Sequence, residues 1–159
     1  MIVEPEALRQ VMRSWTTGVA ILLSRHQEET YGITVNSLSS LALDPPLIAV
    51  TLMNDSYIHR LVSRSHAFTI NILSAAQREL AEIFAGKLQG KERMTSVEVQ
   101  SLPSGSVVLR ECLSWLDCRV THIQPVGPNT LFFAEVVAAQ VYSLDDPLVY
   151  HNRAYHRLA

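Results

Sequence analysis

The chain has 159 residues, a formal net charge of −2 and a hydrophobic content of 48%. This length suits one domain with a sizeable core, and the hydrophobic content excludes a disordered chain. The absence of a Lys/Arg cluster argues against nucleic-acid binding, and the apolar run at residues 45–53 is too short to cross a bilayer. The N-terminus has no apolar signal core. We therefore expect a single domain over residues 1–159, located in the cytoplasm and binding neither nucleic acid nor membrane.

The N-terminal segment predicts a helix followed by a hairpin. Pro5 suits a first helical turn, apolar residues recur at 8, 11, 12 and 15, and Gly18 is the expected end of the helix. Residues 19–23 form an apolar strand, residues 25–30 a polar loop, and residues 31–35 the returning strand.

Small polar side chains are concentrated directly after that hairpin. They are Thr34, Asn36, Ser37, Ser39 and Ser40. The sequence Asp44-Pro45-Pro46 ends the segment before the next strand. We interpret residues 34–40 as a polar, uncharged surface that hydrogen-bonds a phosphate-bearing, polyoxygenated ligand. Serine and threonine also cap helices and fill turns, so this pattern alone leaves a structural role open.

The middle of the chain alternates apolar strands and short helices. Residues 47–52 predict a strand, a helix capped by Asp55 or Ser56 runs through residue 63, and residues 67–73 predict a central strand. Asn71 interrupts that strand, and a buried amide must be hydrogen-bonded. Ser74 and Gln77 form a capping-box pattern for a helix that ends near Gly86.

The C-terminal half predicts long strands. Residues 87–106 are polar and predict a surface excursion, which could cover an active site. Residues 113–123 and 130–142 predict strands joined through residues 125–129, and residues 148–150 a last strand. About seven hairpin-linked strands and a few peripheral helices indicate a mainly β fold, a closed or partly closed antiparallel barrel.

Few residues point to catalytic chemistry. The sequence has no Gly-x-Ser-x-Gly nucleophile motif, phosphate loop or Gly-x-Gly-x-x-Gly turn, and its six histidines have no metal-ligand spacing, so we predict no metal site. His59 and His151 follow strand ends and are retained as candidates. Cys112 and Cys118 predict buried thiols that share one strand and face the same side.

Several motifs, in order, resemble the flavin reductase-like family of FMN-binding split barrels, the reductase partners of two-component flavin monooxygenases. They are WTTGV at 15–19, GITVNS at 32–37, LDPPL at 43–47, NIL at 71–73, FAGK at 84–87, WLDC at 115–118, TLFFAEV at 130–136 and PLVYH at 147–151. The resemblance covers about residues 8–158.

This resemblance implies a homodimer with one FMN per subunit near the interface, FAD being the alternative flavin. It implies hydride transfer from NADH or NADPH to the flavin and a flavin-dependent monooxygenase as partner. The flavin carries the chemistry, and the protein supplies orientation and water exclusion.

The family's binding residues then fall on defined positions. The ring contacts fall on Thr34, Val35, Asn36 and Ser37, and the phosphate and ribityl contacts on Ser39, Ser40, Asn54, Ser56 and His59. Phe84, Gly86 and Lys87 lie near the distal end of the flavin, Thr17 belongs to the N-terminal motif, and His151 orients the nicotinamide.

The chain departs from its relatives at two turns. Gly127-Pro128-Asn129 replaces the Gly-Asp-His associated with NADH, and Asn152-Arg153-Ala154 stands where glycines are common. A flavin-binding electron-transfer or flavin-carrier protein without efficient NAD(P)H turnover is therefore the main alternative. A small barrel that serves only as a binding module is the other.

Overall fold

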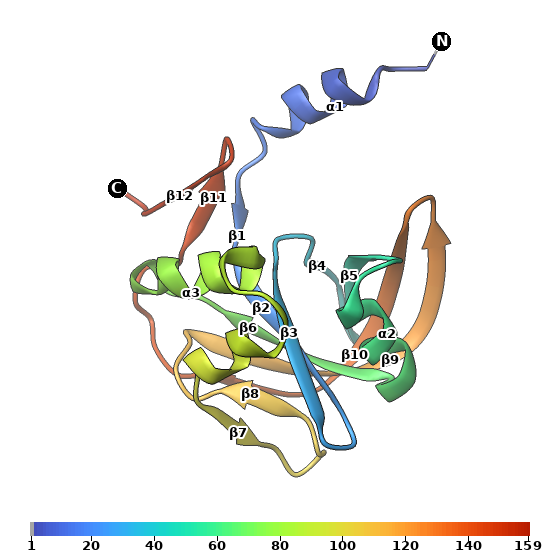
Figure 1. Ribbon diagram of the computed structural model, residues 1–159, viewed down its shortest axis with the longest axis vertical. Helices are drawn as coiled ribbons and strands as arrows, with labels where there is room; N and C mark the ends of the chain where they lie inside the picture. The colour runs from blue at the N-terminus through green and yellow to red at the C-terminus, as the bar shows by residue number, and fades with distance from the viewer. Residues whose placement is uncertain (1) are drawn as a thin grey trace.

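The computed structural model describes residues 2–159 and is built mainly from antiparallel strands (Figure 1). The helices are α1 Pro5–Met12, α2 Tyr57–Ser65, η1 Ala75–Gln77, α3 Arg78–Glu82, the π-helical turn η2 Ile83–Lys87 and the 3₁₀ segment η3 Gly90–Ser96. The strands are β1 Thr17–Gly18, β2 Ala20–His26, β3 Glu29–Val35, β4 Ser39–Leu43, β5 Pro46–Met53, β6 Ala67–Ile72, β7 Val99–Ser101, β8 Val107–Leu109, β9 Ser114–Val126, β10 Asn129–Val141, β11 Val149–His151 and β12 Ala154–His156.

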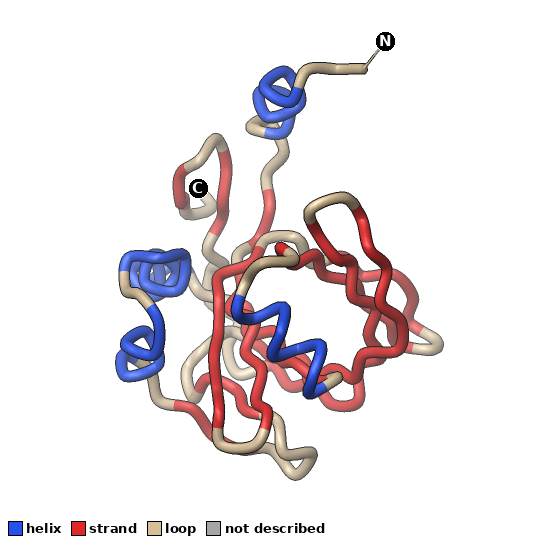
Figure 2. The backbone as a smooth tube through the Cα atoms, turned by 45° about the vertical axis from the view of Figure 1, so that its right-hand side comes forward, coloured by secondary structure: helices blue, strands red, loops and turns tan. Residues whose placement is uncertain are grey.

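Seven strands form one curled sheet in the order β3-β2-β6-β9-β10-β5-β4, with antiparallel pairing throughout. The sheet does not close, because β3 and β4 remain its two edges, and α2 lies across its open side (Figure 2). A small sheet of β1, β11 and β12 joins the two ends of the chain. The predicted mainly β, partly closed barrel with peripheral helices is confirmed.

The core has two halves on opposite faces of β2. Ala20 and Leu22 pack with α2 and the barrel interior, whereas Ile21 and Leu23 pack against the layer that contains Phe84 and β8. A strand that is buried on both faces has a continuous run of apolar residues in its sequence. For this reason β2 could be predicted from the sequence.

Asn71 is a structural residue of β6. Its amide nitrogen donates to the backbone oxygen of Ile21 at 3.0 Å and to Thr69 Oγ1 at 3.1 Å, and its oxygen accepts from the backbone N–H of Leu109 at 2.8 Å. The side chain is fully buried, and its hydrogen bond to Leu109 attaches β8 to the main sheet. This agrees with the expectation that a buried amide at this position is hydrogen-bonded.

The ends of several predicted elements differ from the structure. Helix α1 ends at Met12 and has no buried residue, and Gly18 belongs to β1. Ser39 and Ser40 belong to an edge strand, β4, which sequence analysis missed because its side chains are exposed. The excursion at residues 87–106 contains η3 and β7, and the latter pairs with β8.

The expectation for the two cysteines was wrong in one respect. Both are buried free thiols, but only Cys118 lies on β9, and Cys112 precedes that strand. They belong to different halves of the core, and burial raises the pKa of the Cys112 thiol to about 11. Burial also raises the pKa of the Cys118 thiol, so neither thiol is ionised near neutral pH.

Two properties of residues 2–159 concern membrane spans and metal ligands. No helix there has the length and apolar character of a membrane span. Among the same residues, no group of three or more His, Cys, Asp or Glu side chains could hold a metal ion.

Candidate functional site

A cleft of about 710 Å³ opens beside the free edge of β3. This volume is in the range of small-molecule and cofactor sites. Seven of the predicted binding residues line it, namely Thr34, Val35, Asn36, Ser37, Ser56, Phe84 and Gly86. We call this cavity the main cleft.

The end of β3 and the start of the following segment form the first wall of the main cleft. Thr34 Oγ1 donates to the backbone oxygen of Ala81 at 2.7 Å. The Ser37 hydroxyl donates to the backbone oxygen of Thr51 at 3.1 Å and accepts from the Thr51 N–H at 3.2 Å. These hydroxyls therefore fix the position of the wall, and a ligand would meet the edge backbone of β3 and the Asn36 amide.

The beginning of α2 completes this wall. Ser56 caps the helix, since its hydroxyl accepts from the His59 N–H at 3.3 Å, and Tyr57 and Ile58 also line the main cleft. The first turn of a helix presents N–H groups and a positive dipole end, which suit a phosphate.

Asn54 and His59 lie beside this turn but do not line the main cleft. The Asn54 amide donates to the Gly127 oxygen at 3.2 Å, and Thr130 Oγ1 donates to Asn54 Oδ1 at 2.7 Å. The His59 ring lies 2.9 Å from Thr130 Oγ1 and packs edge-on against Phe132. His59 therefore attaches α2 to the β9–β10 hairpin, and Asn54 attaches the turn before α2 to it.

The opposite wall consists of η2 and the segment that leads to η3. Phe84 is buried, Gly86 has a φ of 126°, and the Gln89 amide donates to the Gly86 oxygen at 2.8 Å. Gly32 lets this wall approach β3, because a Cβ there would lie 3.0 Å from Phe84 Cε1 and 2.4 Å from Leu23 Cδ2.

Arg93 holds this wall and was missed by the sequence analysis. Its side chain is only 5% exposed, and Nη1 donates to the oxygens of Gly32 and Phe84, both at 3.1 Å. Nη2 donates to the Leu88 oxygen at 3.0 Å, and the guanidinium lies 5.0 Å from the centre of the Tyr31 ring. Nothing in the sequence separates Arg93 from the exposed Lys91 nearby, because η3 has no apolar periodicity.

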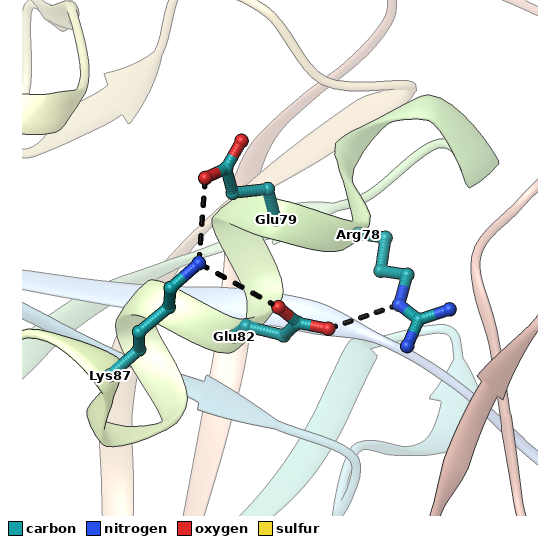
Figure 3. A network of polar contacts seen from close by, with 4 residues as sticks. All are labelled: Arg78, Glu79, Glu82 and Lys87. Carbon is teal, nitrogen blue, oxygen red and sulfur yellow. Dashed lines mark hydrogen bonds and ion pairs between the residues drawn. The ribbon is translucent and has the colours of Figure 1, made fainter.

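Lys87 was predicted to lie near the flavin but does not line the main cleft. Its ammonium lies 3.5 Å from Glu79 and 4.0 Å from Glu82, which also pairs with Arg78 at 3.0 Å (Figure 3). The ammonium is therefore engaged in an exposed ion network on α3 and η2.

Charge is scarce in the main cleft. Among its lining residues only Arg93 is charged, and the tyrosines include Tyr57 and Tyr155. Burial is the main cause that raises the pKa of both phenols, so they stay neutral at physiological pH. The cleft can therefore position and desolvate a ligand, but it has no carboxylate or imidazole for proton transfer.

A second cavity of about 580 Å³ lies between α1 and the β11–β12 turn. It shares Asn36, Ser37 and Tyr150 with the main cleft. Of the other predicted residues, Thr17 and Ser39 line this second cavity, and Ser40 lies on β4 opposite Ile48. His151 Nδ1 lies 3.0 Å from Thr16 Oγ1, between Tyr150 and Asn152, which both line the cavity.

Comparisons with known proteins agree with this geometry. Residues 12–159 match the model of the flavin reductase like domain. The chain is 31% identical over 154 residues to FMN reductase (NADH) RutF of Bradyrhizobium diazoefficiens, covering 97% of this chain and 86% of the relative. It is 34% identical over 144 residues to the reductase component of 4-nitrophenol 4-monooxygenase/4-nitrocatechol 2-monooxygenase of Rhodococcus opacus, covering 91% and 76%.

A solved structure gives the same result for the fold. Flavin reductase PheA2 in its native state superposes with a TM-score of 0.90 and 28% identity over 99% of both chains. The predicted antiparallel split barrel is therefore confirmed.

Proposed function

The chain belongs to the flavin reductase-like family, and we propose that it is an NAD(P)H:flavin oxidoreductase that delivers reduced flavin to a partner monooxygenase. Similar proteins include an NADH-dependent FMN reductase and the reductase component of a two-component monooxygenase. The main cleft is the observation that carries the proposal, because it combines a backbone edge, a helix start and an uncharged lining in one cavity.

The main cleft fits FMN. A flat ring fits between the β3 edge and the Phe84–Gly86 turn, where Gly86 adopts a backbone conformation that disfavours side chains. Asn36 and the backbone of residues 34–37 would hydrogen-bond the ring edge. The start of α2 would hold the phosphate through backbone N–H groups, because the Ser56 hydroxyl donates to the Met53 oxygen at 2.7 Å. When bound, the flavin supplies the hydride-accepting atom.

The residues of the chain act by positioning and by excluding water. Ile33, Val35 and Phe84 give the main cleft apolar surface, and the neutral phenols of Tyr57 and Tyr155 add no charge. The absence of a lining carboxylate or imidazole among residues 2–159 fits a reaction in which no side chain transfers a proton.

His151 is the residue proposed to orient the nicotinamide. Its contact with Thr16 fixes the ring at the boundary of the second cavity, within the β11–β12 hairpin. The Gly127-Pro128 turn is bound to Asn54 and lines neither cavity, so it offers no donor-binding side chain within this subunit. This feature favours the second candidate function, a flavin carrier or electron-transfer protein with slow nucleotide turnover.

A homodimer is proposed from the surface of α1. Leu8 and Val11 are exposed on one face of α1, which projects from the body of the molecule (Figure 1). An apolar face without a partner in its own chain suits a second copy. We also propose that the chain forms a single domain. We propose a cytoplasmic location, because free thiols are typical of a reducing compartment and the partner monooxygenase is expected there.

The test is anaerobic mixing of NADH or NADPH with the FMN-saturated protein, followed by flavin absorbance near its visible maximum. Rapid bleaching with one nucleotide is the expected result. Bound flavin that stays oxidised with both nucleotides would favour the carrier, and a protein that binds neither FMN nor FAD would refute both candidates.

A further inference from the structure

We propose that the second cavity is an anion subsite that binds the diphosphate of the nicotinamide donor. Its defining residues are Arg9, Arg13, Arg153, Trp15, Thr17 and Ser39, and we call it the arginine groove. This inference rests on the proposed reductase function, since it names the site of the second substrate.

The β11–β12 turn is built at a conformational cost. Asn152 and Arg153 have φ values of 47° and 62°, in the left-handed region that glycine adopts most easily. Asn-Gly is the preferred pair for a two-residue hairpin turn, and arginine at the second position carries strain. Because glycine would relieve this strain, the arginine side chain is expected to have a role, and it lines the arginine groove.

Helix α1 places two further cations on the same groove. Arg9 and Arg13 are one turn apart, on the side of the helix opposite Leu8 and Val11. The Asn152 N–H donates to the Arg13 backbone oxygen at 3.1 Å, which ties the end of α1 to the β11–β12 turn.

The charge of the groove is positive after its ion pairs are counted. Glu6 lies 3.3 Å from Arg9 and 3.7 Å from Arg13, and both pairs are solvent-accessible. Within residues 2–159, Arg153 has no carboxylate within ion-pair distance. Three guanidinium groups and one carboxylate therefore face this region, and guanidinium binds phosphate oxygens well.

Two residues that line the groove each have a buried polar atom without a hydrogen-bond partner. The two atoms are Thr17 Oγ1 and Arg13 Nε, and buried polar groups are normally hydrogen-bonded. Trp15 is 67% exposed and offers a flat aromatic face for a base. A ligand that combines an aromatic base with phosphates suits the exposed Trp15 ring and the three guanidinium groups.

The connection to the main cleft selects the donor as that ligand. Asn36, Ser37 and Tyr150 line both cavities, so a molecule whose phosphates lie in the arginine groove can extend a second ring towards the flavin position. The α2 start already offers the main cleft a phosphate site. The arginine groove is thus assigned to the diphosphate of NADH or NADPH.

The test is Arg153→Gly, a change that removes the cation and relaxes the turn. NAD+ binding to the FMN-saturated protein, measured by calorimetry, is expected to weaken on the order of tenfold, as for one lost hydrogen bond to a charged group. The KM for NADH rises by the same factor, while FMN affinity stays within about twofold. Arg110→Gln is the matched control, since Arg110 is an exposed arginine outside both cavities, paired with Glu98.

Two outcomes would overturn the assignment. If Arg153→Gly weakens FMN binding but leaves NAD+ binding unchanged, the groove holds the flavin phosphate. If Arg153→Gly and Arg110→Gln bind NAD+ equally well, the groove is not an anion subsite. If NAD+ binding depends on Arg153 but no flavin is reduced, the subsite stands and the proposed reductase function fails.

Discussion

The two walls of the main cleft are held in different ways. The β3 wall continues the main sheet, so backbone pairing with β2 fixes it along seven residues. The η2–η3 wall has no strand at the cleft, and Arg93 joins it to β3 through the carbonyls of Gly32, Phe84 and Leu88. A wall made by a sheet tolerates side-chain changes, whereas a wall held by one guanidinium depends on that residue.

The largest effect is expected from Arg93→Met. The three carbonyls lose a charged donor, so we expect stability to fall by about 3 kcal/mol and FMN binding to weaken at least about tenfold. Urea unfolding and FMN fluorescence titration measure the two effects. Lys91→Met, an exposed neighbour, is the control and should change neither. An unchanged FMN affinity in Arg93→Met would show that the η2–η3 wall does not contact the flavin.

Gly32→Ala tests the contact between the two walls with a smaller change. The new methyl group meets Leu23 Cδ2 at 2.4 Å and Phe84 Cε1 at 3.0 Å, so overpacking costs about 2 kcal/mol. Gly18→Ala is the matched control, since a Cβ there has no neighbour within 4 Å. Equal thermal unfolding midpoints for the two variants would contradict the close approach of Phe84 to β3.

Lys87→Ala is expected to have the smallest effect. Its exposed ion pairs with Glu79 and Glu82 (Figure 3) contribute at most about 1 kcal/mol, and Lys87 does not line the main cleft. We therefore expect FMN affinity to stay within about twofold of wild type. A larger loss in a fluorescence titration would mean that Lys87 turns towards the flavin phosphate when the ligand binds.

The contrast between the β3 wall and the η2–η3 wall also explains which features could be predicted from the sequence. Strands β2, β6, β9 and β10 follow from their apolar runs, and the capping box at Ser74 is present, with the Ser74 N–H donating to Gln77 Oε1 at 3.0 Å. These features depend on local propensity and burial, which residue type reports directly.

The missed features depend on tertiary contacts. Strand β4 is an exposed edge, and its polar side chains have the same composition as a turn. Arg93 is buried and donates hydrogen bonds to three backbone carbonyls from separate segments. A local sequence pattern cannot predict contacts of this kind. The sequence predicts an apolar face on α1, but it does not predict that this face lies outside the core of its own chain.

The most direct test of the central claim is a crystal structure of the protein with FMN. The account predicts the flavin ring between the β3 edge at Thr34–Ser37 and the Phe84–Gly86 turn, with its phosphate at the start of α2. A flavin bound only in the arginine groove, or outside both cavities, would contradict it.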